Sequence, residues 1–412
     1  MRKNIFLSLI VVVASCFSIV AQETKPEEKT REQGRYNTNK FRQMYNEMAT
    51  PNMFRTASGA PGPAYYQQKA DYKMNLELDD KNSKLYGVET ITYHNNSPEN
   101  LEYLWVQLDQ NIERPDSKTP LVESQNIDKA ITADRFVKKY MDKPFPGGFN
   151  IDYVKDAKGN PLRHTINQTM MRIDLPTPLK SGASLSFGID WNYLITAYYG
   201  RSGLEILGKD NIANYFIAHW FPRLAVYNDV YGWQHKQFMG QGEFTLNFGN
   251  YKVAITAPND IVVGAGGELL NPNQVMTATQ LKRWEQAKTA TRPVAIVNQE
   301  EAIAAEKSVP TGKKTWVFKA DNVRDFAFTA SRKFIWDAMQ VEVEGKKVWA
   351  MSYYSKEGNP LWGKYSTMVV AHTLRSYSKR TVAYPNPVAI SCHATAGGGM
   401  EYPMISFNGG RP

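Results

Sequence analysis

The chain has 412 residues, of which 42% are hydrophobic and 22% charged, an ordinary balance for a globular protein of two or three domains. Its formal net charge is +9, but the basic residues occur as scattered pairs such as Lys138-Lys139 and Lys346-Lys347. A nucleic-acid surface requires a clustered basic patch, so this distribution argues against a nucleic-acid partner.

The first 21 residues have the pattern of a secretory signal peptide. Arg2-Lys3 precede a short apolar segment, and Ala21 provides a small residue at the cleavage site. We therefore predict that residues 1–21 are removed and that the protein is exported, to the periplasm or to the extracellular space. The alternative is an outer-membrane lipid anchor on Cys16, because residues 13–16, Val-Ala-Ser-Cys, resemble a bacterial lipoprotein box. The apolar residues that follow Cys16 argue against this alternative.

Only two cysteines are present, so the loss of Cys16 with a signal peptide would leave Cys392 alone and exclude an intrachain disulfide. Cys392 is more simply interpreted as a small buried apolar residue than as a nucleophile. The next segment, residues 22–64, is polar and ends in Ala-Pro-Gly-Pro, which indicates a linker or an N-terminal arm.

Residues 65–337 show repeated short segments in which every second residue is apolar. The clearest is 185–193, where Leu, Phe, Ile, Trp and Tyr alternate with small or polar residues. Residues 244–248 and 251–255 form another such pair, and Gly249-Asn250 between them predicts a tight turn. Residues 277–308 interrupt the pattern with helical spacing and predict a helical insertion. The fold class is therefore mainly β, an antiparallel β-sandwich.

Residues 338–412 have a mixed pattern. A hairpin is predicted around Glu344-Gly345, followed by a helix from Asn359-Pro360 to about Ser378. A strand at 388–392 then leads into the segment 395–403, Thr-Ala-Gly-Gly-Gly-Met-Glu-Tyr-Pro. Glycines let another backbone approach closely, and a nearby carboxylate can bind a positive group such as a peptide N-terminus. Glycine-rich turns followed by an exposed Glu are also common without any such role.

Residues 398–402, Gly-Gly-Met-Glu-Tyr, resemble the Gly-Ala-Met-Glu-Asn exopeptidase motif of the aminopeptidase N family, the gluzincin zinc metallopeptidases, in a bacterial Gly-Gly-Met-Glu-Tyr-Pro form. Three further stretches resemble the β-domain of that family: 219–223, 240–258 and 323–331. The resemblance extends from about residue 65 to the end. It implies a saddle-like β-sandwich over 65–337, followed at 338–412 by the α+β start of a thermolysin-like catalytic domain.

The resemblance also implies roles for four residues and a substrate. Glu401 would bind the free amine of a peptide, and the backbone of Gly398 and Gly399, beside Met400, would pair with that peptide. Tyr402 stands where the family more often has Asn, which puts the side-chain preference in doubt. The implied function is that of an exported zinc aminopeptidase, which removes N-terminal residues from peptides.

The zinc motif of that family, H-E-x-x-H on a helix, is missing from this sequence. None of the six histidines has a second histidine four residues away, and His372 on the predicted helix is followed by Thr373. His393 is close enough to Glu401 in sequence to line its cleft. We expect zinc in the full-length protein, no zinc ligand and no catalytic residue within this chain, a truncation before the motif, and no activity. The alternative is a non-catalytic secreted β-sandwich module that binds protein or glycan.

Overall fold

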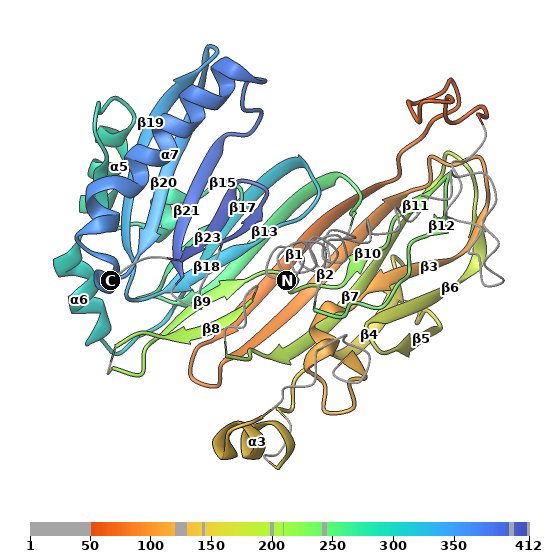
Figure 1. Ribbon diagram of the computed structural model, residues 1–412, viewed down its shortest axis with the longest axis horizontal. Helices are drawn as coiled ribbons and strands as arrows, with labels where there is room; N and C mark the ends of the chain where they lie inside the picture. Colours follow the sequence, from red (N-terminus) through yellow and green to blue (C-terminus); the bar gives the residue numbers. More distant parts are fainter. Residues whose placement is uncertain are drawn as a thin grey trace, which may run out of the picture. The chain divides into compact units, whose positions relative to one another are not determined.

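The computed structural model describes residues 51–119, 130–141, 145–197, 202–208, 210–240, 245–394 and 399–409. The predicted signal peptide and Cys16 lie outside this described part of the chain. The chain divides into two compact units, Met1–Pro63 and Ala64–Pro412, which are described separately. Strands predominate in the second unit, which confirms the mainly β class (Figure 1). A search of the described helices finds none with the length and apolarity to cross a membrane.

The described residues of the first unit form a short turn. Arg55 and Pro61 make an isolated β-bridge across it. The side-chain oxygen of Asn52 accepts hydrogen bonds from the backbone N–H groups of Phe54 and Arg55, at 2.8 and 2.9 Å. Asn is common in such turns because its side chain can replace a backbone acceptor.

A seven-stranded sheet is the largest element of the second unit. Its strands pair antiparallel except for the central pair β1 and β13, which run parallel. In sheet order they are β15 (Glu268–Leu269), β17 (Lys313–Val323), β13 (Gly249–Pro258), β1 (Lys69–Asp79), β2 (Lys84–His94), β7 (Ser184–Leu194) and β4 (Asn150–Asp156).

Three smaller sheets and several short helices complete the β-rich part as far as the structure describes it. One sheet has the order β10 (Arg223–Leu224), β3 (Leu101–Gln107), β6 (Met170–Leu179), β5 (His164–Asn167). A second has the order β14 (Val262–Ala265), β18 (Phe328–Ser331), β9 (Ala213–Ile217), β8 (Gly203–Ile206). The third sheet is the pair β11 (Tyr227–Asn228) and β12 (Gly232–Trp233). The described helices are the 3₁₀ helix η2 (Asp109–Glu113), α3 (Ala133–Tyr140) and α4 (Pro272–Val275).

The predicted alternation at 185–193 is confirmed in β7. Phe187, Ile189, Trp191 and Tyr193 are all buried, because successive strand residues point to opposite faces of the sheet. The interior of this part is rich in aromatic rings. Tyr72 of β1, for example, stacks on Tyr251 of β13 with ring centroids 4.8 Å apart.

The rest of the second unit contains a six-stranded mixed sheet and four helices. In sheet order the strands are β16 (Val294–Val297), β19 (Ile335–Val343), β20 (Lys346–Tyr354), β21 (Val388–Ala394), β23 (Ile405–Gly409) and β22 (Gly399–Tyr402). The helices are α5 (Ala278–Ala287), α6 (Gln299–Glu306), the 3₁₀ helix η3 (Lys356–Gly358) and α7 (Leu361–Arg380).

Helix α7 connects β20 to the parallel strand β21 and covers one face of this sheet (Figure 1). Its Ala371 and Leu374 pack against a set of buried residues on that face, Met339, Val341, Val343, Val348 and Ala350. The predicted helix is therefore confirmed. So is the hairpin, because β19 and β20 are joined through Glu344 and Gly345, both with positive φ as a two-residue hairpin requires.

The helices α5 and α6 both begin with a capping box. The Thr277 hydroxyl accepts from Gln280 N–H at 3.2 Å, and the Asn298 side chain accepts from Glu301 N–H at 2.8 Å. In each case the third helical residue bonds back to the N–H of the cap, which satisfies two backbone donors at the start of the helix. Strand β16 lies between these helices and pairs with β19.

The predicted turn at Gly249-Asn250 is wrong. Gly249 instead opens strand β13, beside Ala70 of β1. A Cβ at position 249 would lie 1.6 Å from the Ala70 carbonyl oxygen. Gly249 is therefore required because two backbones approach each other closely here. From the sequence pattern alone, a glycine of this kind cannot be distinguished from a glycine in a turn.

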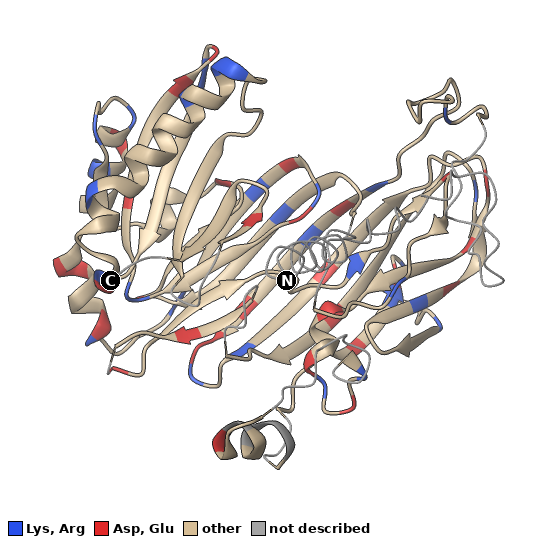
Figure 2. Cartoon of the chain, viewed as in Figure 1, with Lys and Arg blue, Asp and Glu red and all other residues tan. Residues whose placement is uncertain are grey.

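The charged residues of the described chain are interspersed. Figure 2 shows Lys and Arg next to Asp and Glu along the strands and loops of both parts of the second unit. Cross-strand pairs such as Lys313 with Glu77 neutralise one another at the surface.

Candidate functional site at the edge strand β22

Strand β22 carries the described part of the glycine-rich motif and lies at the end of its sheet. It pairs antiparallel with β23, with Glu401 opposite Ser406. Gly399 and Glu401 are exposed and Met400 is half-buried, whereas Gly398 lies outside the described residues. Within the described chain no strand pairs with the outer edge of β22. Its backbone therefore has hydrogen-bonding groups on one side for another extended segment.

The turn that follows β22 holds it against the β-rich part of the unit. Met404 and Ile405 are buried, and Met404 has a positive φ of 66°. Gly266 allows the close contact, because a Cβ there would lie 2.4 Å from the Pro403 carbonyl oxygen. The strand is thus positioned by a packed turn and not only by its pairing with β23.

The carboxylate of Glu401 lies above Gly399, two residues earlier on the same face of the strand. A Cβ at Gly399 would be 3.2 Å from Glu401 Oε1. The glycine therefore leaves room for this carboxylate beside the backbone. Among the described residues the Glu401 carboxylate has no hydrogen-bond or ion-pair partner.

A pocket of about 120 Å³ lies beside Glu401. Its lining combines β22 and its turn with residues of the β-rich part, His219, Arg223, Leu246, Arg324 and Asp325. The three stretches that resemble the β-domain of the aminopeptidase N family, 219–223, 240–258 and 323–331, therefore all meet the 398–402 motif at one place.

The charges behind this pocket are fixed by a buried ion-pair cluster. Arg223 is 2% exposed and donates to Asp325 at 2.7 Å and to Asp109. His219 Nδ1 lies 3.6 Å from the same Asp109 carboxylate. Removal of Arg223 would leave two buried carboxylates without a cation, so this side chain holds the cluster together.

His219 is held in an unusual backbone conformation next to the candidate site. Its φ is 52°, and its carbonyl oxygen accepts a hydrogen bond from Gln110 Nε2 at 3.0 Å. Its ring meets Tyr402 edge to face, with centroids 5.8 Å apart. Position 402 is where the sequence departs from the family motif, and Tyr402 is here in contact with the histidine.

His393 and Cys392 do not belong to this pocket. His393 is 1% exposed and packs against Trp362 of α7 with ring centroids 5.0 Å apart, and burial lowers its pKa. Cys392 is fully buried, and burial raises the pKa of its thiol well above the usual range. An inert buried thiol is what the sequence interpretation expected.

The described residues do not fit a zinc site. No group of three or more His, Cys, Asp or Glu side chains in the described ranges is arranged to hold a metal ion. His372 on α7 is exposed and hydrogen-bonds to Ser376 at 3.2 Å. A catalytic zinc needs three convergent protein ligands, and among the described residues Glu401 belongs to no such group. No step of chemistry through a metal is therefore derived from these residues.

Asp109 was missed at the sequence level because it belongs to no local motif. It reaches Arg223, behind the pocket, from the 3₁₀ helix that follows β3. The two partners of Arg223 are separated from it by more than a hundred residues on either side. Only information that links distant positions of the sequence could have predicted these ion pairs.

Solved structures with a similar fold are M1 zinc metallopeptidases. The enzyme from Deinococcus radiodurans, as a variant, has a TM-score of 0.48 and 13% identity, over 82% of this chain and 59% of that chain. The same enzyme bound to a Tyr-Ser-Ala substrate gives 0.49 and 13%, over 82% and 60%. A two-domain M1 zinc metallopeptidase bound to L-tryptophan gives 0.48 and 13%, over 84% and 62%.

The chain thus spans about 60% of the length of these structures. No protein-family model matches the chain, and a search of curated proteins finds no match. At this degree of similarity the solved structures assign no role to any residue of this chain.

Proposed function

We propose that this chain is the N-terminal part of an exported zinc aminopeptidase, with β22 as the strand that binds the peptide and Glu401 as the anchor for its free amine. The observation that carries the proposal is the unpartnered Glu401 carboxylate above Gly399 on a strand with an open edge. The motif resemblance of residues 398–402 supports the same role.

In this proposal a peptide adds to the open edge of β22 as an extended strand. Backbone hydrogen bonds give the peptide its direction, and the exposed glycine lets it approach without a side-chain clash. The ammonium group at the peptide N-terminus then donates to Glu401. A charge-assisted hydrogen bond of this kind would select peptides with a free N-terminus over blocked ones.

Zinc would supply the activated water that cleaves the peptide. The residues that the structure describes offer no set of side chains that could hold it. We therefore expect this chain to bind peptides without hydrolysing them. Export is part of the proposal through the Arg2-Lys3 and Ala21 pattern, and secretion of a fusion to residues 1–21 would test it.

The binding role is tested with a labelled peptide whose N-terminus is either free or acetylated. Fluorescence anisotropy should show tighter binding of the free form, by about tenfold or more, because a hydrogen bond to a charged group is lost on acetylation. Glu401→Gln should abolish the difference, whereas Glu102→Gln, at an exposed position of β3, should preserve it. Equal affinities for the two peptides would contradict the role of Glu401.

The second candidate is a secreted, non-catalytic β-sandwich module that binds protein or glycan. The mainly β architecture without a zinc ligand set in the described residues favours it. This candidate predicts binding that does not depend on a free N-terminus or on Glu401. The same anisotropy experiment therefore separates the two candidates.

A further inference from the structure

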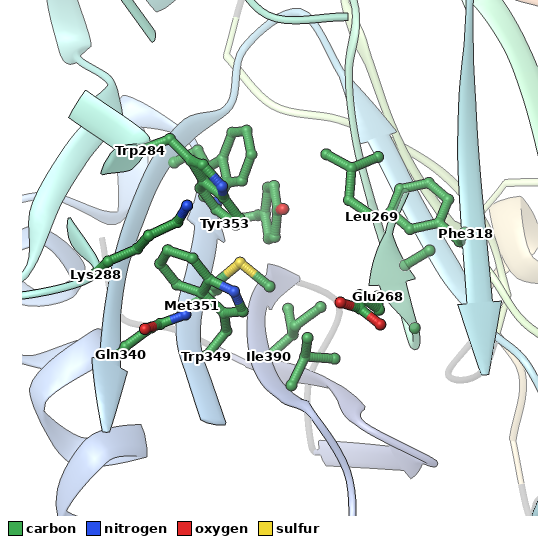
Figure 3. Close-up of a pocket in the computed structure, with 14 residues that line it drawn as sticks. Glu268, Leu269, Trp284, Lys288, Phe318, Gln340, Trp349, Met351, Tyr353 and Ile390 are labelled. Atoms are coloured by element: carbon green, nitrogen blue, oxygen red, sulfur yellow. The ribbon is translucent and has the colours of Figure 1, made fainter. Parts of the chain in front are cut away.

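A second pocket, of about 230 Å³, lies on the other face of the six-stranded sheet from α7 (Figure 3). Strand β20 contributes Trp349, Met351 and Tyr353, alternate residues that share one face. The residues that contact α7, Val348 and Ala350, point to the opposite face. The pocket is closed by Trp284 of α5 and by residues of β15 and β17.

Aromatic rings form one continuous wall of this pocket. Trp284 stacks on Trp349 with centroids 3.8 Å apart, and Trp336 lies 5.3 Å from Trp284. Trp336 in turn stacks on Tyr353 at 5.3 Å. All four side chains are nine-tenths or more buried. The faces and edges of such rings attract apolar groups and, through their π-electrons, cations.

A single acidic side chain faces this wall across the pocket. Figure 3 shows Glu268 on the opposite side from Trp284 and Trp349, near Leu269 and Phe318. Glu268 is exposed at the mouth and, among the described residues, has no hydrogen-bond or ion-pair partner.

The basic residues around the pocket are already paired elsewhere. Lys288 lies in the lining, but its ammonium donates to both oxygens of Glu285 at 2.7 Å. Lys319 is directly opposite Glu268 in the β15–β17 ladder and interacts with its charge, but its ammonium binds Asp321, 2.6 Å away. The charge that the pocket offers to a ligand is therefore the negative charge of Glu268.

We propose that this pocket binds a small organic cation, a primary amine attached to an aromatic or apolar group. The apolar group would lie against the tryptophan wall and the ammonium would reach Glu268. The size is suitable, because an apolar cavity of roughly 150 Å³ holds benzene and the pocket here has room for a ring with a short amine arm. This site is separate from Glu401 and does not depend on the proposed peptidase role.

The probe is phenethylamine, titrated into the purified full chain by isothermal calorimetry. A ligand of this size should bind with a Kd of about 1 mM. Its neutral analogue 2-phenylethanol and the anion 3-phenylpropionate should bind at least about tenfold more weakly, because neither can form the charged hydrogen bond to Glu268. Equal binding of the three compounds, or none by phenethylamine, would overturn the proposal.

Three variants locate the bound amine. Glu268→Gln should weaken phenethylamine binding about tenfold, to the level of the neutral analogue, without a change in melting temperature, because residue 268 is exposed. Glu300→Gln, at an exposed position of α6, should leave binding unchanged. Glu401→Gln should also leave it unchanged. If Glu401→Gln weakens binding and Glu268→Gln does not, the amine binds at β22 and the pocket proposal is wrong.

Discussion

Glu89 is an acidic residue buried in the interior of the β-rich part. It is 1% exposed on the inward face of β2, and neither carboxylate oxygen has a hydrogen-bond partner among the described residues. Burial alone raises the pKa of this carboxyl well above its usual value. An ionised carboxylate without a partner is costly in an apolar interior, so the folded protein favours the protonated form.

The raised pKa predicts that Glu89 lowers stability as pH increases. Below the unfolded-state pKa of about 4.5 the group is protonated in both states and has no effect on the free energy of unfolding. Above it the unfolded chain releases the proton first, so stability is lost by about 1.4 kcal/mol per pH unit until the folded-state pKa is reached. Glu89→Gln should remove this loss and be more stable than the parent at pH 7.

Urea unfolding at several pH values measures this effect. The difference in unfolding free energy between Glu89→Gln and the parent should grow from pH 4 to pH 7. Glu102→Gln, at an exposed position, should change stability by no more than about 0.5 kcal/mol. A stabilisation by Glu89→Gln that is the same at both pH values would assign the effect to packing and contradict the titration argument.

The candidate site was predictable from the sequence only where its residues form a local motif. Glu401 and Gly399 are two residues apart, and the structure brings the carboxylate above the glycine. Arg223, Asp109 and Asp325 form their ion pairs across more than a hundred residues, so no local pattern contains that information. Tertiary structure alone determines which charge compensates which.

Gly249 shows the limit of strand prediction at the level of the element. Residues 251–255 lie in β13 as predicted, whereas residues 245–247 form no strand and the predicted pairing is wrong. Alternating apolar residues identify a strand, but they do not name its neighbour. Here β13 pairs parallel with β1, which lies about 180 residues earlier, and the two backbones come together at Gly249. The glycine was interpreted as a turn because turns are the commoner use of a Gly-Asn pair.

The close contact at Gly249 predicts a large loss of stability on substitution. Gly249→Ala would place a Cβ 1.6 Å from the backbone oxygen of Ala70, so β1 and β13 would have to separate at this point. Overpacking of this kind typically costs about 1–3 kcal/mol, and backbone atoms can relax less than side chains. Thermal unfolding followed by circular dichroism should show a melting temperature lowered by several degrees.

Gly312→Ala is the matched control for this substitution. Its nearest neighbour would be an Asn259 side-chain nitrogen at 4.0 Å, and its backbone is not in the left-handed region. This variant should melt within about a degree of the parent, since surface changes away from special features are small. If both alanine variants melt alike, the β1–β13 contact does not constrain the fold as described.

At the scale of the whole molecule, the sequence predicts the mixture of strands and helices but not the pocket that they form. The period of two in 185–193 and the helical spacing before Ser378 indicate strands first and a helix later, and the structure has both. The aromatic pocket was not predicted. Trp284 and Trp349 are 65 residues apart, and each alone is typical of an ordinary core residue.

Helix α7 gives the whole molecule an apolar surface feature. One side of the helix packs on the sheet through residues such as Ala371 and Leu374. The other exposes a row of large apolar side chains: Leu361, Tyr365, Met368, Val369 and Tyr377. Val369 is 58% exposed within this row. Exposed apolar rows of this kind promote association, and the scattered positive charge of the chain opposes it only in part.

We therefore expect the chain to self-associate through α7 as its concentration is raised. Val369→Glu should reduce the association, because a charge in the row must be desolvated whenever two such surfaces meet. Val309→Glu makes the same change at a valine that is 83% exposed and away from the helix, so it should have little effect. Dynamic light scattering over a concentration series measures both variants against the parent. If the two variants change the hydrodynamic radius equally, the added negative charge and not the row on α7 controls association. If neither variant changes the hydrodynamic radius, the exposed row on α7 does not drive association and the prediction is wrong.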